Sequence, residues 1–248
     1  MKTKCSFAAR AATVALCFAG VVLAQSGPPP AARSQVVLVH VKSDMLNEWM
    51  DLQKNELVPV QKKAGVATRT TYQTVFGNTN EFLIVTPLGK YAEFDGPSQL
   101  EHVLGAGGAA RLAAKLQKCL ESRQVFISNS MPELSSGPAG QLPALGVFTR
   151  VRVATGKLED YEAFVKGEIL PIYKKADVNM TVTRRGLGAN ANDVVQVSWL
   201  TKMADIDAGS PITRALGPAG AAKLLAKTAG MATLVEQVVR RRVPDLSY

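Results

Sequence analysis

The stretch Glu56-Leu57-Val58-Pro59-Val60-Gln61-Lys62-Lys63-Ala64 occurs again as Glu168-Ile169-Leu170-Pro171-Ile172-Tyr173-Lys174-Lys175-Ala176, 112 residues later. At this offset residues 35–136 align with residues 147–248 without a gap, with about 30 identities. An aligned segment of this length has the size of a small domain. The chain is therefore predicted to contain the same domain twice, in tandem.

Both copies show the same order of hydrophobic patterns. Alternating β-branched and aromatic residues indicate strands, and apolar residues at helical spacing indicate helices. A Gly/Asn-rich turn between two strand patterns indicates a hairpin. In the first copy the pattern predicts a strand at 35–42, a helix at 45–64, strands at 68–76 and 81–86, a helix at 109–120 and a strand at 124–129.

A proline lies inside the first helix pattern of each copy, at Pro59 and at Pro171. Proline lacks the N–H that the helix needs, and its ring collides with the carbonyl one turn earlier. We therefore expect the first helix of both copies to be kinked at the same place.

The element order βαββαβ predicts a four-stranded antiparallel sheet with both helices on one face. The other face of such a sheet remains uncovered in a single copy. Two copies in one chain cover it by packing these faces together. The predicted fold class is α+β: two tandem ferredoxin-like βαββαβ repeats packed sheet to sheet as an intramolecular, pseudo-dimeric α/β barrel.

The N-terminal segment has the pattern of a secretory signal. Basic residues precede an apolar run of about 13 residues, and small residues precede a cleavage site after Ala24. The predicted organisation is a signal peptide at 1–24, a flexible tether at 25–34, repeat 1 at 35–134, a linker at 135–146 and repeat 2 at 147–248. The protein is expected to be exported, periplasmic or extracellular, and monomeric with an internal pseudo-dimer.

Charge and cysteine content limit the function classes. The formal net charge of +9 falls to +6 when Lys2, Lys4 and Arg10 leave with the signal peptide. The other basic residues are spread over both copies without interleaved aromatic residues, so nucleic acid is not an expected partner. No segment after the signal is apolar enough to cross a membrane. Cleavage leaves Cys119 alone, which excludes an internal disulfide.

The element order, the Glu-x-x-Pro-x-x-Lys-Lys-Ala core and the tandem copying resemble the dimeric α/β-barrel superfamily. That superfamily includes antibiotic-biosynthesis-type monooxygenases and NIPSNAP-like proteins, and the resemblance covers both copies. It implies a barrel of two ferredoxin-like units whose interior holds a small apolar or aromatic molecule, or haem. No catalytic residue of a named member transfers to this sequence.

The first strand of each copy predicts which side chains face the interior. If Val37, Val39 and Val41 face the helices, then His40 faces the interior. By the same alternation Arg150 and Arg152 face inward in the second copy, and Tyr72 with its aligned partner Arg184 lines the next strand. We hypothesise that His40, Tyr72, Arg150, Arg152 and Arg184 bind a small anionic or aromatic ligand. Alternatively, the arginines pair with acidic residues or reach solvent at the mouth of the barrel.

Other motifs carry less information about chemistry. His40 and His102 are the only histidines, which is too few for a typical zinc or iron site, so no metal site is predicted. No cofactor is predicted either, although each histidine remains an alternative as a lone axial ligand of haem. The glycines at 105–108 indicate a tight entry into the second helix rather than a dinucleotide site, because no preceding strand is evident.

Three function classes follow from the sequence. The first is an exported, non-catalytic protein that binds a small ligand in the barrel. The second is a monooxygenase-type oxidoreductase, which rests on the superfamily resemblance. The third is a structural or interaction module with a filled core. Whether the protein is an enzyme stays open at this level, because no catalytic constellation is visible.

Overall fold

The computed structural model describes residues 33–137 and 143–248 of the chain. The predicted signal peptide at residues 1–24 lies outside these ranges, as do most of the predicted tether and the middle of the predicted linker. The described residues belong to one unit. Within them no helix is long and apolar enough to cross a membrane.

The elements of repeat 1 follow the predicted order, with most boundaries shifted by a few residues and the start of the second helix ten residues earlier than predicted. They are β1 (Arg33–Val41), α1 (Leu46–Leu52), a π-helical turn (Gln53–Leu57), α2 (Val58–Lys63), β2 (Thr70–Thr74), β3 (Glu81–Leu88), α3 (Gln99–Lys118) and β4 (Leu120–Ser130), with short 3₁₀ turns at Ser43–Met45, Tyr91–Phe94 and Pro132–Leu134.

Repeat 2 has the same elements in the same order. They are β5 (Leu145–Val153), α4 (Leu158–Phe164), a π-helical turn (Val165–Ile169), α5 (Leu170–Lys175), β6 (Met180–Arg185), β7 (Asp193–Leu200), α6 (Pro211–Ala226) and β8 (Ala232–Arg242), with 3₁₀ turns at Met203–Asp205 and Pro244–Leu246.

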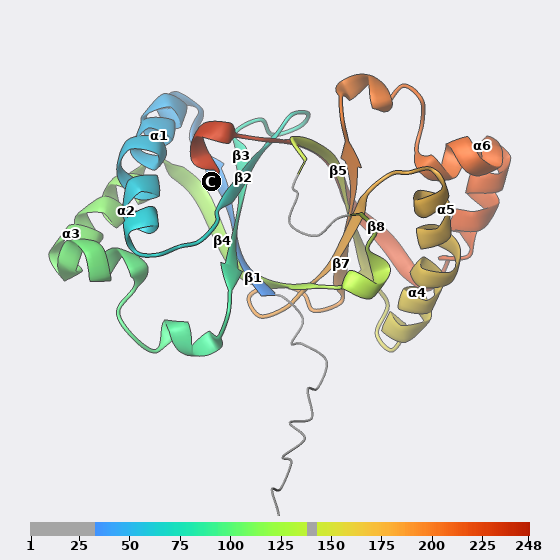
Figure 1. The fold of residues 1–248 in the computed structure, drawn as a ribbon, viewed down its shortest axis with the longest axis horizontal. Coiled ribbons are helices and arrows are strands. Elements are labelled where there is room, and N and C mark those ends of the chain that lie inside the picture. Colours follow the sequence, from blue (N-terminus) through green and yellow to red (C-terminus); the bar gives the residue numbers. More distant parts are fainter. Residues whose placement is uncertain (1–32, 138–142) are drawn as a thin grey trace, which may run out of the picture. The chain divides into compact units, whose positions relative to one another are not determined.

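The eight strands form a closed antiparallel barrel in the order β1-β3-β2-β8-β5-β7-β6-β4 (Figure 1). Each repeat contributes four neighbouring strands. Two seams join the repeats, at β2–β8, where Tyr72 lies opposite Arg242, and at β4–β6, where Ser128 lies opposite Arg185. The predicted fold class is confirmed, and hydrogen-bonded edges as well as opposed faces hold the two sheets together.

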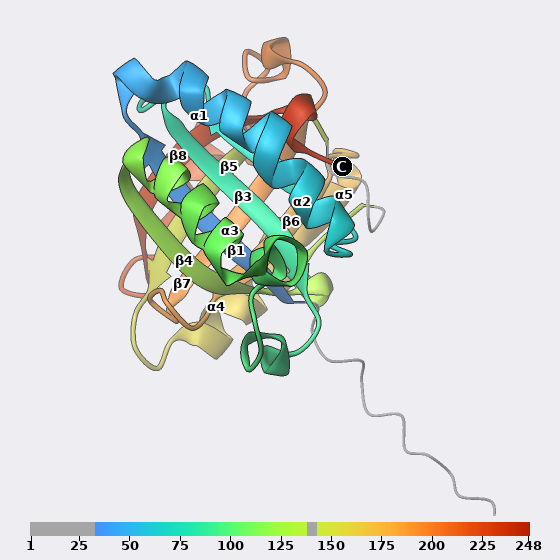
Figure 2. The same cartoon turned by 90° about the vertical axis from the view of Figure 1, so that its left-hand side faces the viewer.

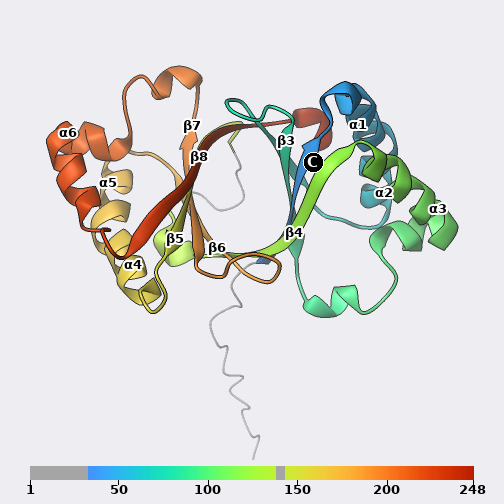
Figure 3. The ribbon, with the colours of Figure 1, turned by 180° about the vertical axis from the view of Figure 1, so that it is seen from behind.

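Helices cover the outer face of each sheet. In Figure 2, α1, α2 and α3 lie over the strands of repeat 1, and in Figure 3, seen from behind, α4–α6 flank the strands of repeat 2. Each helix layer has its own apolar core, centred on Trp49 and Phe82 in repeat 1 and on Tyr161 and Val194 in repeat 2. A third core, with Phe148 near its centre, fills the lumen of the barrel.

The proline in the first helix of each repeat follows one π-helical turn. Pro59 and Pro171 occupy the second position of α2 and α5, directly after the turns Gln53–Leu57 and Val165–Ile169. A wider turn before the proline relieves its collision with the preceding carbonyl and bypasses its missing N–H. The expected distortion is therefore present in both copies, and it takes the form of a π turn.

Each π turn is also tied to the second helix of its own repeat. Lys115 of α3 donates to Glu56 at 2.8 Å, and the aligned Lys227 donates to Glu168 at 2.6 Å. All four side chains are half exposed, so each pair contributes little to stability. The pairs connect the second helix of each repeat to the π turn of the first at aligned positions.

The last residues of each repeat pack on the other repeat. Leu134 of repeat 1 is buried in the helix-side core of repeat 2, and Leu246 of repeat 2 is buried in the helix-side core of repeat 1. Backbone hydrogen bonds anchor both segments, including a reciprocal pair between Arg69 and Tyr248. The two repeats therefore complete each other's cores.

Candidate functional site

The strand faces of β1 are as the alternation predicts. Val39 and Val41 pack in the helix-side core, whereas Val36 and Leu38 pack in the lumen core. His40 lies on the lumen face, directly opposite Glu81 of β3. Its Nε2 is 2.8 Å from Glu81 Oε2.

Glu81 is the centre of a polar cluster in the lumen. It is 7% exposed and contacts His40, the hydroxyl of Thr74 at 3.0 Å and a guanidinium nitrogen of Arg240. Burial by itself would raise the pKa of Glu81, but hydrogen bonds led by that from Arg240 outweigh it and hold the pKa below its ordinary value. The carboxylate is therefore ionised at neutral pH.

Arg150 and Arg152 also lie on the lumen face and are paired with acids. Arg150 donates to Asp193 at 3.1 Å and to Glu236 at 3.3 Å, and Arg152 donates to Asp193 at 2.8 Å. The alternative that these arginines pair within the protein is thus the arrangement seen, and neither is held open for a ligand.

Tyr72 lies on the lumen face as predicted, in an aromatic cluster. Its ring centroid is 5.4 Å from that of Phe148 and 5.8 Å from that of Trp199, and these two rings are 5.7 Å apart. Such contacts are favourable beyond the area they bury. The cluster fills the middle of the lumen with side chains, so the predicted ligand position at Tyr72 is occupied by protein.

The predicted lumen position of Arg184 is wrong. In repeat 1 Tyr72 lies opposite Leu83, but the aligned Arg184 lies opposite Val194, one residue out of register. Val194 is buried in the helix-side core, so Arg184 points outward, and its Nε donates to the carbonyl of Ala191 at 2.8 Å. A shift of one residue exchanges the two faces of a strand. Arg185 therefore takes the lumen position.

A large cleft lies outside the lumen, between the sheet of repeat 2 and its helices. Its volume is about 1020 Å³. The outward faces of β5 and β7 form its floor, α4 and α5 form one wall, and the start of α6 with the preceding loop forms the other. Residues from these elements include Thr149, Tyr161, Tyr173, Gln196, Trp199 and Ile212.

Aligned positions of the two repeats explain why the cleft is found in repeat 2. In repeat 1, Trp49 and Phe82 stack at a centroid distance of 4.4 Å and fill the space between sheet and helices. Their aligned partners are the smaller Tyr161 and Val194. Three apolar residues of the repeat 1 core also have polar partners in the cleft: Val37, Ile84 and Leu116 align with Thr149, Gln196 and Thr228.

Two buried phenols supply the polar chemistry of the cleft. Tyr161 Oη accepts a hydrogen bond from Gln196 Nε2 at 2.8 Å, so its own hydrogen is available to a ligand. Tyr173 Oη lies 2.7 Å from Ser198 Oγ. Burial raises the pKa of both tyrosines, so both stay protonated at neutral pH and each keeps a hydroxyl hydrogen that it can donate.

Exposed apolar side chains and the cationic Arg214 are among the residues that line the cleft. Leu225 and Leu234 line the cleft and are 50% and 60% exposed, which is unusual for such large apolar side chains. Arg214 of α6 lines the cleft as well. It is close enough to Tyr173 to act on its pKa, in the direction opposite to burial.

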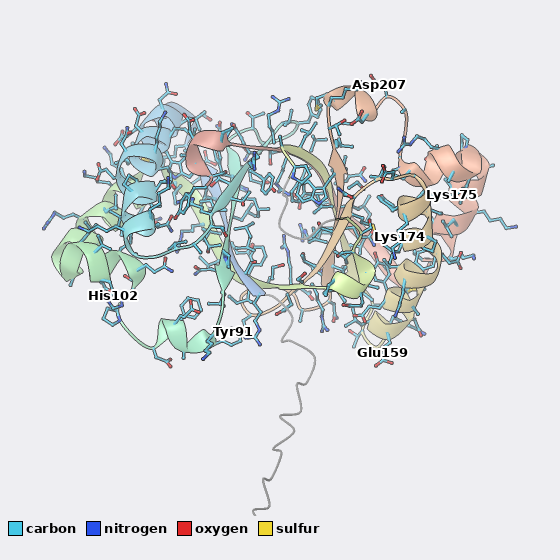
Figure 4. All side chains as sticks on the ribbon, in the orientation of Figure 1. Tyr91, His102, Glu159, Lys174, Lys175 and Asp207 are labelled. Atoms are coloured by element: carbon cyan, nitrogen blue, oxygen red, sulfur yellow. The ribbon has the colours of Figure 1, made fainter. Side chains whose placement is uncertain are left out.

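Neither histidine lies in the cleft. His40 is in the lumen, and His102 is on α3 of repeat 1, pointing away from the barrel (Figure 4). Among the residues that the structure describes, no group of three or more His, Cys, Asp and Glu side chains could hold a metal ion. Haem iron requires an axial His, Cys, Met or Tyr ligand, and the only such residues lining the cleft are Tyr161 and Tyr173. Burial disfavours the phenolates that iron would bind, so the cleft residues do not fit haem.

Solved structures with the same architecture cover nearly the whole chain. A Fusobacterium nucleatum protein with a provisional assignment as a monooxygenase matches with a TM-score of 0.58 at 11% identity, over 86% of this chain and 93% of its own. The chain has the dimeric α/β-barrel fold.

Two further dimeric α/β-barrel structures match to a similar degree. An anthrone oxidase-like protein matches with a TM-score of 0.56 at 10% identity, over 86% of this chain and 92% of its own. A chlorite dismutase from Candidatus Nitrospira defluvii in complex with imidazole matches with a TM-score of 0.54 at 8% identity, over 87% of this chain and 92% of its own. No protein-family model matches the sequence, and neither does any curated protein. At such identities the likeness concerns the fold alone.

Sequence reasoning missed the cleft because it compared the copies only on their lumen face. The sequence difference that indicates the cleft lies on the opposite, helix-side face of the same strands. Thr149 and Gln196 stand where repeat 1 has Val37 and Ile84, and a polar residue at an apolar core position indicates either a buried hydrogen bond or a binding site.

Proposed function

We propose that this protein binds a small, largely apolar organic molecule in the cleft of repeat 2. The observation that carries the proposal is a cleft of about 1020 Å³ between a sheet and helices that are otherwise closely packed. Ligand pockets in proteins commonly have volumes of about 300–1,000 Å³, apolar walls and a few convergent polar groups. The lumen, where the sequence suggested a ligand, is occupied by the aromatic cluster and by ion pairs.

The polar groups of the cleft suit a ligand that carries a carbonyl or hydroxyl oxygen. Tyr161 has a hydrogen to donate, and the apolar side chains Phe164 and Ile212 line the walls beside it. Arg214, which also lines the cleft, favours a ligand that carries an acidic group as well. The ligand class is therefore an aromatic or polycyclic ketone, phenol or acid. The signal-like segment at residues 1–24 supports the further proposal that binding takes place outside the cytoplasm.

Oxidation of the bound molecule is the second candidate. It is supported by the shared fold with an anthrone oxidase-like protein and with a protein provisionally assigned as a monooxygenase. The neutral phenols of Tyr161 and Tyr173 suit stabilisation of a developing negative charge on a ligand oxygen, as preorganised donors do in other enzymes. The binding function does not depend on this step.

Anthrone, a tricyclic aromatic ketone, is a suitable probe for both candidates, and an anilinonaphthalene sulfonate dye is a second probe with an acidic group. Both are expected to bind the full mature chain. Tyr161→Phe removes one hydroxyl without changing the shape of the cleft and should weaken anthrone binding about tenfold, which is the effect of one hydrogen bond. Titration followed by fluorescence measures this, and oxygen uptake with anthrone tests for oxidation.

The matched control is Tyr91→Phe, because Tyr91 is an exposed tyrosine of repeat 1. It should leave both titrations unchanged. If neither probe binds the wild type, or if Tyr161→Phe and Tyr91→Phe bind alike, the cleft is not the binding site. Binding without oxygen uptake would support the binding function and exclude oxidation of anthrone.

A further inference from the structure

Charged side chains gather at one end of the barrel lumen. The antiparallel pairing brings the ends of β1, β2, β5 and β6 together with the starts of β3 and β7. Four guanidinium groups and three carboxylates meet there: Arg150, Arg152, Arg185 and Arg240 with Glu81, Asp193 and Glu236. This end of the lumen therefore has an excess of positive charge, even with His40 counted as neutral.

All three carboxylates are already engaged. Asp193 accepts from both Arg150 and Arg152. Glu236 accepts from Arg150 and lies 3.9 Å from Arg240. The remaining acid, Glu81, is held by Arg240 and two further donors, as described above. No carboxylate among these is left for the fourth guanidinium.

Arg185 is the guanidinium that has no carboxylate of the described residues at ion-pair distance, although Asp193 and Glu236 are near enough to act on its pKa in the direction opposite to burial. Within residues 33–137 and 143–248 it makes no ion pair, and its Nε is buried without a hydrogen-bond partner. Its guanidinium lies over the ring of Phe126, 4.4 Å from the centroid. Burial, with the nearby Arg150, lowers its pKa to about 10. The Nε of Arg240, whose side chain is 6% exposed, is likewise buried without a partner.

Partly buried positive charge without an ion-pair partner is costly, and two unsatisfied N–H groups at one place match the acceptors of an oxyanion. We propose that this end of the lumen binds a small oxyanion, inorganic phosphate or the carboxylate of a small acid, between Arg185 and Arg240. This site is separate from the cleft, which lies on the other face of the sheet. The proposal therefore stands or fails independently of the cleft ligand.

The neighbouring arginines of β6 provide a matched pair of variants. Arg185→Gln removes the lumen guanidinium, whereas Arg184→Gln removes one that points outward. Thermal unfolding of the full mature chain is measured in phosphate and in acetate, each against chloride at the same ionic strength and pH. Wild type and Arg184→Gln should gain about 5 °C in the midpoint at saturating oxyanion, and Arg185→Gln should gain none.

In chloride alone Arg185→Gln should be as stable as wild type or more stable, because it removes a partly buried charge that makes no ion pair. Phosphate and acetate are compared separately, so the arm that shows the Arg185-dependent gain identifies the class of anion. The proposal is overturned if all three proteins respond alike to both oxyanions. It is also overturned if Arg185→Gln is destabilised by the same amount in every anion, since Arg185 would then serve only to pack on Phe126.

Discussion

Single carboxylates hold the lumen together. Glu81 joins three strands through His40 of β1, Thr74 of β2 and Arg240 of β8. Because β2 and β8 belong to different repeats, this carboxylate spans one of the two seams of the barrel. Asp193 has the aligned position in repeat 2, and its partners Arg150 and Arg152 lie within that repeat. The two copies have thus kept an acid at this position and changed its partners.

The pKa of Glu81 predicts a loss of stability in acid. A carboxylate whose pKa is lowered by folding contributes its full stabilisation above its unfolded pKa, near 4.5, and loses it as the pH falls through the folded value. Glu81→Gln should cost about 3 kcal/mol at pH 7, because Arg240 is left buried without its carboxylate. Urea unfolding measured from pH 7 to pH 3 should show the difference from wild type shrinking below about pH 4.5.

Glu121→Gln is the control for this series, because Glu121 is exposed on β4. It should follow the wild-type curve closely. A constant difference between Glu81→Gln and wild type over the whole pH range would show that the ionised carboxylate is not what stabilises this end of the barrel.

Glycines shape the second helix of each repeat. Within α3, Gly105 has φ 68° and ψ 164°, and the aligned Gly217 of α6 has φ 69° and ψ 169°. Side chains strongly disfavour this conformation. The helix therefore starts at Gln99, breaks at Gly105 and continues, whereas the sequence pattern suggested a loop at 105–108 before a helix that begins at 109. The break repeats in both copies because both kept the glycine.

Two glycines of α3 should respond to alanine in opposite directions. Gly105→Ala should destabilise the protein by about 1–3 kcal/mol, because alanine is strained at this φ and ψ. Gly107→Ala should stabilise it by about 0.5–1 kcal/mol, because Gly107 is helical and an added methyl meets only the end of the Arg111 side chain at 3.6 Å. Urea midpoints measure both, and equal effects would mean that the helix is not broken at Gly105.

The exchange of terminal segments makes the two repeats one folding unit. Leu134 and Leu246 are 1% and 0% exposed, and each lies in the helix-side core of the repeat to which it does not belong in sequence. The seams at β2–β8 and β4–β6 add backbone hydrogen bonds between the repeats. A single repeat would expose both edges of its sheet and its whole lumen face.

We therefore expect the two repeats to unfold together. The sequence has two tryptophans, Trp49 in repeat 1 and Trp199 in repeat 2, so Trp199→Phe and Trp49→Phe give proteins whose fluorescence reports on one repeat each. Leu246→Ala should cost about 2–4 kcal/mol and shift both reporters equally, although Leu246 is buried in the helix-side core of repeat 1. Separate transitions for the two reporters would contradict this coupling.

The duplication, the order of elements and the burial faces of β1 and β5 could be predicted from the amino-acid sequence. These features depend on local periodicity and on the alignment of the two copies, and both can be recognised in the sequence. The distortion at Pro59 and Pro171 is of the same kind, because proline acts on the helix in which it stands.

Tertiary structure decided which residues face the lumen on β6 and where a ligand has room. The register of β6 depends on its hairpin and on its seam with β4, and one residue of slip places Arg185 inside and Arg184 outside. The cleft depends on Tyr161 and Val194, which occupy the positions that align with Trp49 and Phe82 of repeat 1. The two members of each pair are far apart in sequence. Register and cavity volume arise from contacts between distant segments, and the periodicity of a single strand or helix does not encode them.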